Sequence, residues 1–357
     1  MEQAMKMAKA QREELGSRPL SGVDCNESPA RYWALTGFDD AAAITVCNEI
    51  NREWMFALVT FHGEGKISFS ISQKTWERGE GHYPTVIQLC GALAKDPRLS
   101  ASKGSFIVWL EDGMWDWCKH YSRRAPIMAF GRSKNDTTTF LIPDPAFVGG
   151  MGYAQEERES KLLRLRTPWS ERRPTIFWRG AATGTGIEGP EWVDTARGML
   201  ARKAREIGDA SIVDAKITRI KHLPPENALV LESQGVVDRE VPFDSFFTYK
   251  YIVDADGYHC AWKSLFLKLM TGSVVLKMDS PFEQWYHRDL VPWKHYIPLS
   301  RDLAELKDLH AWLRAHDSEA QAIANQGGEF ISQVTLEATV DHSVRAIERM
   351  LGARRAP

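Results

Sequence analysis

Residues 175–186 read Thr-Ile-Phe-Trp-Arg-Gly-Ala-Ala-Thr-Gly-Thr-Gly, and this stretch decides the fold class. Its first half carries the β-branched and aromatic residues of a buried strand, and its second half contains small residues. A helix is predicted over 190–207. The stretch therefore predicts a strand that enters a helix through a glycine-rich loop, which is typical of α/β proteins with a parallel sheet.

The same alternation continues toward the C-terminus. Strand-like and helix-like stretches follow one another at the spacing of a doubly wound parallel sheet. The predicted strands are 210–217, 249–257, 272–279 and 295–300, and the predicted helices are 261–271 and those that follow residue 303. Because ligands bind outside the carboxyl ends of the strands in such sheets, the loops after these strands are the first candidates for a site.

The residues before this region predict a first domain of mixed strands and helices. The predicted strands are 54–61 and 66–72, joined as a hairpin, then 105–110, 126–131 and 138–142, with a helix at 83–95. A charged helix at 155–166 ends at a proline-bracketed segment, residues 167–174, where we place the domain boundary. The predicted domains are 1–168 and 169–334, and a final helical segment, 335–357, is expected to pack back on the first domain.

Composition narrows the function classes. A chain of 357 residues is long enough for two domains, and its net charge of -2 offers no positive field for a nucleic-acid partner. The five cysteines form no C-x-x-C pair, and the N-terminus lacks an apolar signal segment, so we expect a cytoplasmic protein. No run approaches the ~18 apolar residues of a spanning helix, which leaves peripheral contact with the inner face of a membrane open.

Two loops at the ends of predicted strands are candidate ligand-binding sites. Small residues after Arg179 and Gly180, including Thr183 and Gly184, let backbone N–H groups approach a phosphate, although a plain strand-to-helix turn has the same pattern. The second loop is Asp254-Ala255-Asp256-Gly257, followed by Lys263. It predicts contacts to sugar hydroxyls and a diphosphate, to a metal through D-x-D, or an ordinary Asp-Gly turn and helix cap.

A carboxylate at the end of the predicted strand 105–110 is a candidate general base. Glu111-Asp112-Gly113 follows this strand directly, and a carboxylate that projects into a cleft from there can accept a proton. The alternative is again a turn-forming sequence. The ten histidines lack metal-ligand spacing and no G-x-S-x-G occurs, so a histidine metal site and the usual hydrolases are disfavoured.

Six blocks occur in an order that resembles the CAP10-like glycosyltransferases of family 90. The blocks are PWSER at 168–172, WRG at 178–180, YKYIVDADG at 249–257, GSVVLK at 272–277, PFEQWY at 281–286 and PWKHYIP at 292–298. The similarity covers roughly residues 100–332. The family includes protein O-glucosyltransferases, capsule xylosyltransferases and lipopolysaccharide-modifying enzymes.

The resemblance implies a GT-B-like architecture, with two Rossmann-like domains facing across a cleft. It implies acceptor binding and the base in 1–168 and a UDP-sugar donor held by 169–334. It also implies an inverting transfer, without a metal or a further cofactor, of glucose or xylose to a hydroxyl of a glycan or lipid-linked glycan.

The resemblance also assigns roles to individual residues. Asp112 matches the catalytic base. The donor-binding positions are Arg179, Gly180, Thr183, Gly184, Asp256, Gly257, Lys263 and Glu283. Many members have arginine at the position of Lys263, and replacing its forked donors by a point charge changes the geometry of diphosphate binding.

The chain contains 13 tryptophans, and aromatic rings stack well on sugars. Trp109, Trp115 and Trp117 flank Asp112 and are the ones expected to touch an acceptor sugar. Two alternatives follow from the same residues. One is a non-catalytic carbohydrate-binding protein, and the other is a metal-dependent glycosyltransferase that uses Asp254 and Asp256.

Overall fold

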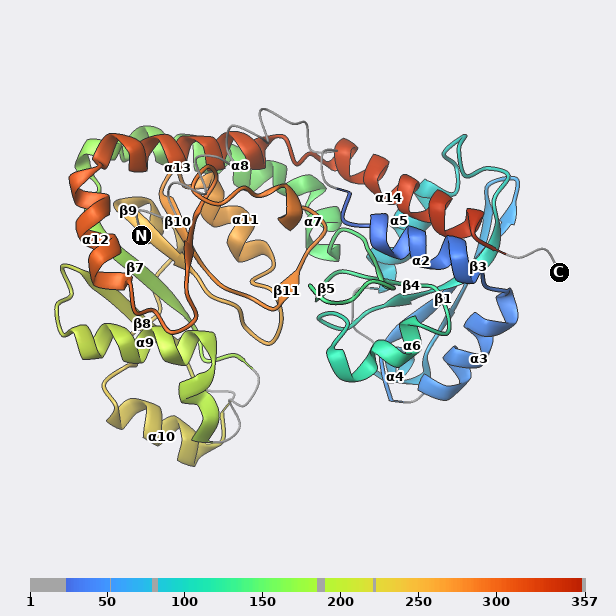
Figure 1. The fold of residues 1–357 in the computed structure, drawn as a ribbon, viewed down its shortest axis with the longest axis horizontal. Helices are drawn as coiled ribbons and strands as arrows, with labels where there is room; N and C mark the ends of the chain where they lie inside the picture. The colour runs from blue at the N-terminus through green and yellow to red at the C-terminus, as the bar shows by residue number, and fades with distance from the viewer. Residues whose placement is uncertain (1–23, 52, 79–82, 185–189, 221–222, 355–357) are drawn as a thin grey trace. The chain divides into compact units, whose positions relative to one another are not determined.

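The computed structural model describes residues 24–51, 53–78, 83–184, 190–220 and 223–354, which form two compact units (Figure 1). The N-terminal unit contains the described residues up to 152 together with 281–289 and those from 334 onward. The C-terminal unit contains 153–280 and 290–333. The predicted α/β class with two sheet-centred units is confirmed. The chain changes unit at residue 153, however, so the expected boundary segment 167–174 lies inside the C-terminal unit.

The N-terminal unit is built on a mixed five-stranded sheet. Its strands, in spatial order, are β2 (Lys66–Ile71), β1 (Phe56–Gly63), β3 (Lys103–Trp109), β4 (Ile127–Ala129) and β6 (Phe140–Leu141). The predicted hairpin of β1 and β2 is confirmed. β3 pairs antiparallel with β1 and parallel with β4, and its side chains from Phe106 to Trp109 are fully buried, as its apolar run predicts.

A short two-stranded ladder joins a distant segment to this unit. β5 (Arg132–Ser133) pairs antiparallel with β11 (Phe282–Glu283), which the sequence did not predict. The helices of the unit are α2 (Glu27–Thr36), α3 (Asp40–Ile50), α4 (Gln73–Arg78), α5 (Tyr83–Leu93), α6 (Lys119–Ser122), α7 (Pro145–Gly149) and α14 (Leu336–Gly352), with 3-10 turns at Asp116–Cys118 and His287–Asp289. Helix α14 contacts α2 and α5, so the last helix belongs to the N-terminal unit.

The C-terminal unit is built on a fully parallel sheet. Its strands, in spatial order, are β12 (Ile297–Leu299), β10 (Val274–Met278), β9 (Tyr249–Asp254), β7 (Arg173–Ala181) and β8 (Val213–Arg219). The helices are α8 (Ala154–Arg166), α9 (Ala196–Ile207), α10 (Pro225–Ser233), α11 (Lys263–Met270), α12 (Leu306–Ala315) and α13 (Asp317–Ser332), with 3-10 turns at Met151–Tyr153, where the units meet along the chain, and at Trp169–Glu171, Pro190–Asp194 and Phe243–Thr248. The predicted doubly wound sheet is confirmed.

The strand order of the C-terminal unit reverses between β7 and β9. From β7 the chain steps to β8 on one side, and it then returns to β9 and continues to β10 and β12 on the other side. From these two neighbouring strands the chain therefore continues toward opposite edges of the sheet. This is the topological switch point at which doubly wound sheets bind ligands. No helix among the described residues is long and apolar enough to cross a membrane.

Candidate active site

The loops after β7 and β9 touch at the switch point. A Cβ atom added to Gly257 would lie 2.7 Å from Thr183 Oγ1, so a larger residue at this position would push the two loops apart. A Cβ atom at Gly184 would lie 2.8 Å from the Cβ of Thr195, which caps the N-terminus of α9. The structure thus brings together three of the predicted donor residues, Thr183, Gly184 and Gly257. They lie next to the N-terminus of α9, and helix N-termini are favourable positions for anions.

Arg197, which the sequence did not single out, ties the two loops together. It lies in the first turn of α9, and its guanidinium donates to the Ala181 carbonyl oxygen at 3.0 Å and to the Thr183 hydroxyl. Its Nε donates to the Ala255 carbonyl oxygen at 3.3 Å. Burial lowers the pKa of Arg197, although the nearby Asp254 and Asp256 favour its charge. The sequence signal was present, since Thr195 caps a helix that begins after a glycine-rich loop.

Charged side chains line the ends of β9 and β10. Asp254 and Lys268 are both buried and form an ion pair with an Nζ–Oδ1 distance of 3.0 Å. Lys277 lies beside Asp254 in the register of the two strands. Burial opposes the charge of Lys277, but the carboxylates of Asp256 and Asp254 raise its pKa overall. Burial raises the pKa of Asp256, and Lys277 counteracts this effect.

The charge balance of this cluster favours an anion. The cluster has three basic side chains, Arg197, Lys268 and Lys277, and two acidic ones, Asp254 and Asp256, although burial lowers the pKa of Lys268 as it does that of Arg197. In a partly desolvated site a surplus positive charge interacts strongly with a bound diphosphate. The Oδ2 atom of Asp254 is buried and has no hydrogen-bond partner within the described part of the chain.

The two predicted phosphate-binding cations have carboxylate partners instead. Arg179 on β7 pairs with Asp214 at 2.8 Å and with Asp238 at 3.4 Å, and its guanidinium lies 4.7 Å from the centre of the Phe177 ring. Gly180 follows it on the same strand, where a Cβ atom would lie 2.5 Å from the Trp178 ring. The guanidinium of Arg179 is thus part of a structural ion-pair network.

Lys263, at the first position of α11, is similarly engaged. Its ammonium group pairs with Glu156 of α8 and lies 4.9 Å from the centre of the Tyr153 ring. The pairing partner and the aromatic ring both come from the start of α8, not from the switch-point loops. Arg197 thus bonds to both switch-point loops, whereas Arg179 and Lys263 pair with carboxylates outside these loops.

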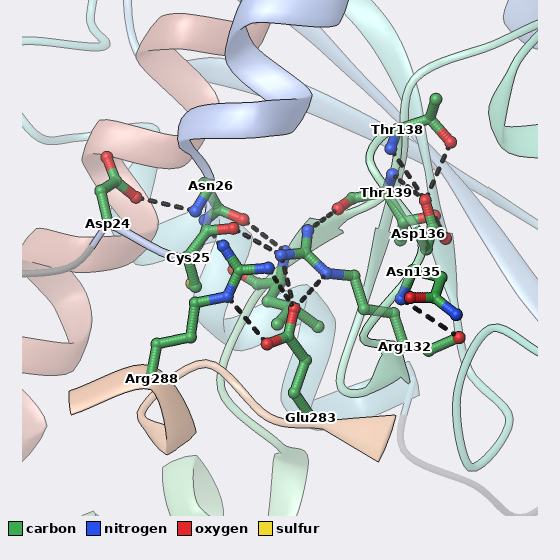
Figure 2. A network of polar contacts seen from close by, with 12 residues as sticks. Asp24, Cys25, Asn26, Arg132, Asn135, Asp136, Thr138, Thr139, Glu283 and Arg288 are labelled. Carbon is green, nitrogen blue, oxygen red and sulfur yellow. Dashed lines mark hydrogen bonds and ion pairs between the residues drawn. The ribbon is translucent and has the colours of Figure 1, made fainter. Parts of the chain in front are cut away.

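Glu283 lies in the N-terminal unit, apart from the C-terminal unit that contains the switch point. Figure 2 shows its carboxylate between two guanidinium groups. Arg132 donates to it through Nε at 2.9 Å and through Nη2 at 2.8 Å, and Arg288 donates through Nε at 2.8 Å. Both oxygens of Glu283 already accept hydrogen bonds from arginine. Glu283 thus belongs to the N-terminal unit, whereas the other predicted donor-binding residues belong to the C-terminal unit.

Asp112 lies on an exposed loop just beyond the carboxyl end of β3. The backbone of this loop is fixed on both sides, because Leu110 N–H donates to the Met55 carbonyl at 3.1 Å and Met114 N–H donates to the Gly131 carbonyl at 2.8 Å. Met114 also forms a parallel bridge with Arg132 of β5. The structure thus places the Asp112 carboxylate at an exposed position after the carboxyl end of β3.

The three predicted acceptor tryptophans have different environments. Trp109 is fully buried in the core, so it cannot touch a sugar, and its ring lies 6.1 Å from that of Trp54. Trp115 is half-buried and packs edge-on against Phe282 at 5.5 Å. Trp117 is 53% exposed, and its ring lies 4.7 Å from that of Trp54. Of the three predicted acceptor tryptophans, Trp117 is the most exposed.

Comparison with known proteins gives a family match. The model described as "Glycosyl transferase family 90" matches residues 112–346. Protein O-glucosyltransferase 2 of Danio rerio is 29% identical over 223 residues, which cover 61% of this chain and 41% of that protein. Protein O-glucosyltransferase 1 of Rattus norvegicus is 28% identical over 191 residues, which cover 52% of this chain and 44% of that protein. The chain thus spans less than half the length of either relative.

Solved structures resemble the chain at low identity. Anabaena HepE in complex with UDP and glucose is 10% identical, with a TM-score of 0.43 over 74% of each chain. WaaG, a glycosyltransferase involved in lipopolysaccharide biosynthesis, is 12% identical, with a TM-score of 0.36 over 66% of this chain and 69% of that chain.

Proposed function

We propose a function from the premise that this chain belongs to glycosyl transferase family 90, whose model matches more than half of its length. The proposed reaction is an inverting, metal-independent transfer of a sugar from a UDP-sugar to a hydroxyl of a glycan or lipid-linked glycan. The names of the relatives favour glucose as the sugar. The observation that carries the proposal is the cationic switch point formed by Arg197, Lys268 and Lys277.

The donor side of the proposed site stabilises the leaving group. When the bond to the anomeric carbon breaks, negative charge develops on the diphosphate of UDP. Arg197 is held by hydrogen bonds to both loops, so its positive charge needs no reorganisation at that moment. The N-terminus of α9 and the backbone N–H groups around Gly184 add further positive potential.

The acceptor side of the proposed site supplies one base. In an inverting transfer the acceptor hydroxyl attacks from the face opposite the diphosphate, and it loses its proton as the new bond forms. Asp112 is the proposed base, because it is an exposed carboxylate on a loop fixed at Leu110 and Met114. Trp117, five residues after Asp112 in the sequence, offers an exposed ring on which an acceptor sugar can stack.

Ion pairing argues against the metal-dependent alternative. A D-x-D metal site needs both carboxylates as ligands, but Asp254 is paired with buried Lys268 and Asp256 is influenced by Lys277. The described residues contain no cluster of three or more His, Cys, Asp or Glu side chains that could hold a metal.

A UDP-release screen tests the function directly. The full chain is incubated with UDP-glucose, UDP-xylose and other UDP-sugars, with glycan, lipid-linked glycan and peptide acceptors, and with or without EDTA. We expect acceptor-dependent release of UDP from UDP-glucose that EDTA does not reduce. Glycan binding without UDP release from any donor would indicate a carbohydrate-binding protein, and loss of release in EDTA would favour the metal-dependent alternative.

Substitution of Arg197 distinguishes the two candidate phosphate-binding arginines. We expect Arg197→Gln to weaken UDP binding by about 10- to 100-fold, because a charge-assisted hydrogen bond contributes roughly 1.5–3 kcal/mol. Isothermal titration of UDP measures the effect. Arg202→Gln, exposed on the same helix, is the matched control and should bind as the unmodified chain does. A loss of affinity in Arg179→Gln, with none in Arg197→Gln, would return the phosphate role to Arg179.

A further inference from the structure

A polar cavity lies at the amino ends of the strands of the C-terminal sheet. It has a volume of about 100 Å³, and it is lined by Arg164, Trp169, Arg172, Gly272, Gln321 and Asn325. Arg172 directly precedes β7, and Gly272 lies just before β10. The cavity is therefore at the amino ends of the strands, whereas the switch point is at their carboxyl ends. The proposed glycosyl transfer uses none of its residues.

Arg172 brings a buried positive charge to this cavity without an acidic partner. Its side chain belongs to a residue that is 5% exposed, and it donates through Nε to the Thr167 carbonyl at 2.9 Å and through Nη1 to the Ser273 hydroxyl at 3.0 Å. Neither acceptor is charged. Burial, together with the positive charge of Arg164, lowers the pKa of Arg172 to about 10. No carboxylate of the described residues forms an ion pair with it.

Arg164 places a second guanidinium beside the first. A Cβ atom at Gly272 would lie 2.7 Å from its Nε, and a Cβ atom at Gly328 would lie 3.4 Å from its Nη1, so the group packs against backbone at two glycines. Within the described ranges it has neither a hydrogen bond nor an ion pair. In contrast, Lys250 and Lys268 of the same unit both pair with a carboxylate. Two neighbouring guanidiniums without a counter-ion are unusual, because such an arrangement is electrostatically costly.

The shape and chemistry of the cavity fit a tetrahedral oxyanion. Guanidinium groups present forked N–H donors that match the oxygens of a phosphate. Gln321 and Asn325 lie one turn apart on α13 and add amide groups to the wall. A water molecule takes about 30 Å³ in the liquid, so the cavity has room for a group of a few heavy atoms.

We propose that Arg164 and Arg172 form a phosphate-binding site in this cavity, separate from the switch point. The ligand is inorganic phosphate or the terminal phosphate of a phosphomonoester. The bound anion is the counter-ion of the two arginines, and its binding stabilises the folded C-terminal unit by mass action. The inference does not depend on the proposed glycosyl transfer.

Titration of the full chain with inorganic phosphate, at ionic strength matched with chloride, tests the site. We expect Arg164→Gln to weaken phosphate binding at least tenfold. Arg166→Gln, exposed in the same last turn of α8, is the matched control and should leave binding unchanged. A parallel titration with glycerol phosphate shows whether the site prefers free phosphate or a phosphomonoester. Binding of the preferred ligand supports the site if Arg164→Gln weakens that binding.

A second variant supplies a counter-ion from the chain itself. We expect Asn325→Asp to raise the melting temperature in phosphate-free buffer and to remove the stabilisation that phosphate gives to the unmodified chain. Three results would overturn the proposal: no phosphate binding by the unmodified chain, equal binding by Arg164→Gln, or binding that is lost in Arg197→Gln but not in Arg164→Gln. The last result would place the anion at the switch point.

Discussion

Asp112→Asn is expected to lower the rate of sugar transfer by about 10²- to 10⁴-fold, the contribution typical of a positioned general base. The amide keeps the size and the hydrogen-bonding ability of the side chain but cannot accept the proton of the acceptor hydroxyl. UDP affinity should not change, because the proposed donor site lies in the other unit of the chain. The measurements are turnover with UDP-glucose and an identified acceptor, and titration with UDP.

The matched control for this substitution is Asp116→Asn. Asp116 is an exposed carboxylate a few residues along the same chain segment, and it pairs with Lys119. Loss of this surface ion pair should lower the stability by about 0–1 kcal/mol and leave turnover within about threefold. Glu111 is the competing base, with a buried Oε1 atom 3.9 Å from the Lys74 ammonium. If Glu111→Gln abolished transfer while Asp112→Asn remained active, the base would be Glu111.

The sequence predicted the C-terminal sheet well because its strands are local and strongly patterned. The apolar runs that became β7, β9 and β10 are bounded by turn residues, and parallel strands with helical crossovers leave few alternative topologies. The domain boundary was harder to predict. Residues 281–289 belong to the N-terminal unit although they lie between β10 and β12 of the C-terminal sheet in the sequence. Pairing between β5 and β11 joins residues far apart along the chain, and a local pattern cannot show it.

In the candidate site, too, features encoded by neighbouring residues were predicted, and features that depend on distant residues were not. Thr183, Gly184 and Gly257 were predicted because small residues in a loop are a local signal. Whether a cation is available to a ligand depends on its spatial neighbours. Asp214 lies on a neighbouring strand and Glu156 on a distant helix, so the sequence could not show that they pair with Arg179 and Lys263.

For Trp109 the sequence did contain the signal. The nearly continuous apolar run of β3 predicts burial of all its side chains, and Trp109 is the last residue of that strand. Its proximity to Asp112 in sequence outweighed this pattern in the prediction of an acceptor contact. The exposed partner of the tryptophan cluster, Trp117, lies in the 3-10 turn Asp116–Cys118 beyond the strand, where no apolar run requires burial.

Arg132→Met should destabilise the N-terminal unit by about 3–5 kcal/mol, the cost of breaking a buried ion pair. Arg132 is fully buried and connects three segments, because it donates to Glu283, to the Thr139 carbonyl and to the Cys25 carbonyl (Figure 2). Methionine fills much of the volume but leaves these acceptors without their donor. Urea unfolding measures the loss, and hydrogen exchange of residues 281–289 should show the largest local increase.

Arg124→Met is the matched control for the loss of an arginine–carboxylate pair. Arg124 donates to both oxygens of Glu49 but is exposed, so its removal should cost about 0–1 kcal/mol. The double variant Arg132→Met/Glu283→Gln should recover part of the stability lost in Arg132→Met, because it removes the charge left without one of its two arginines. Equal stability of Arg132→Met and Arg124→Met would mean that the buried network does not hold residues 281–289 in the N-terminal unit. Stability would then have to come from the backbone pairing of β5 with β11 and from the packing of Phe282 against Trp115.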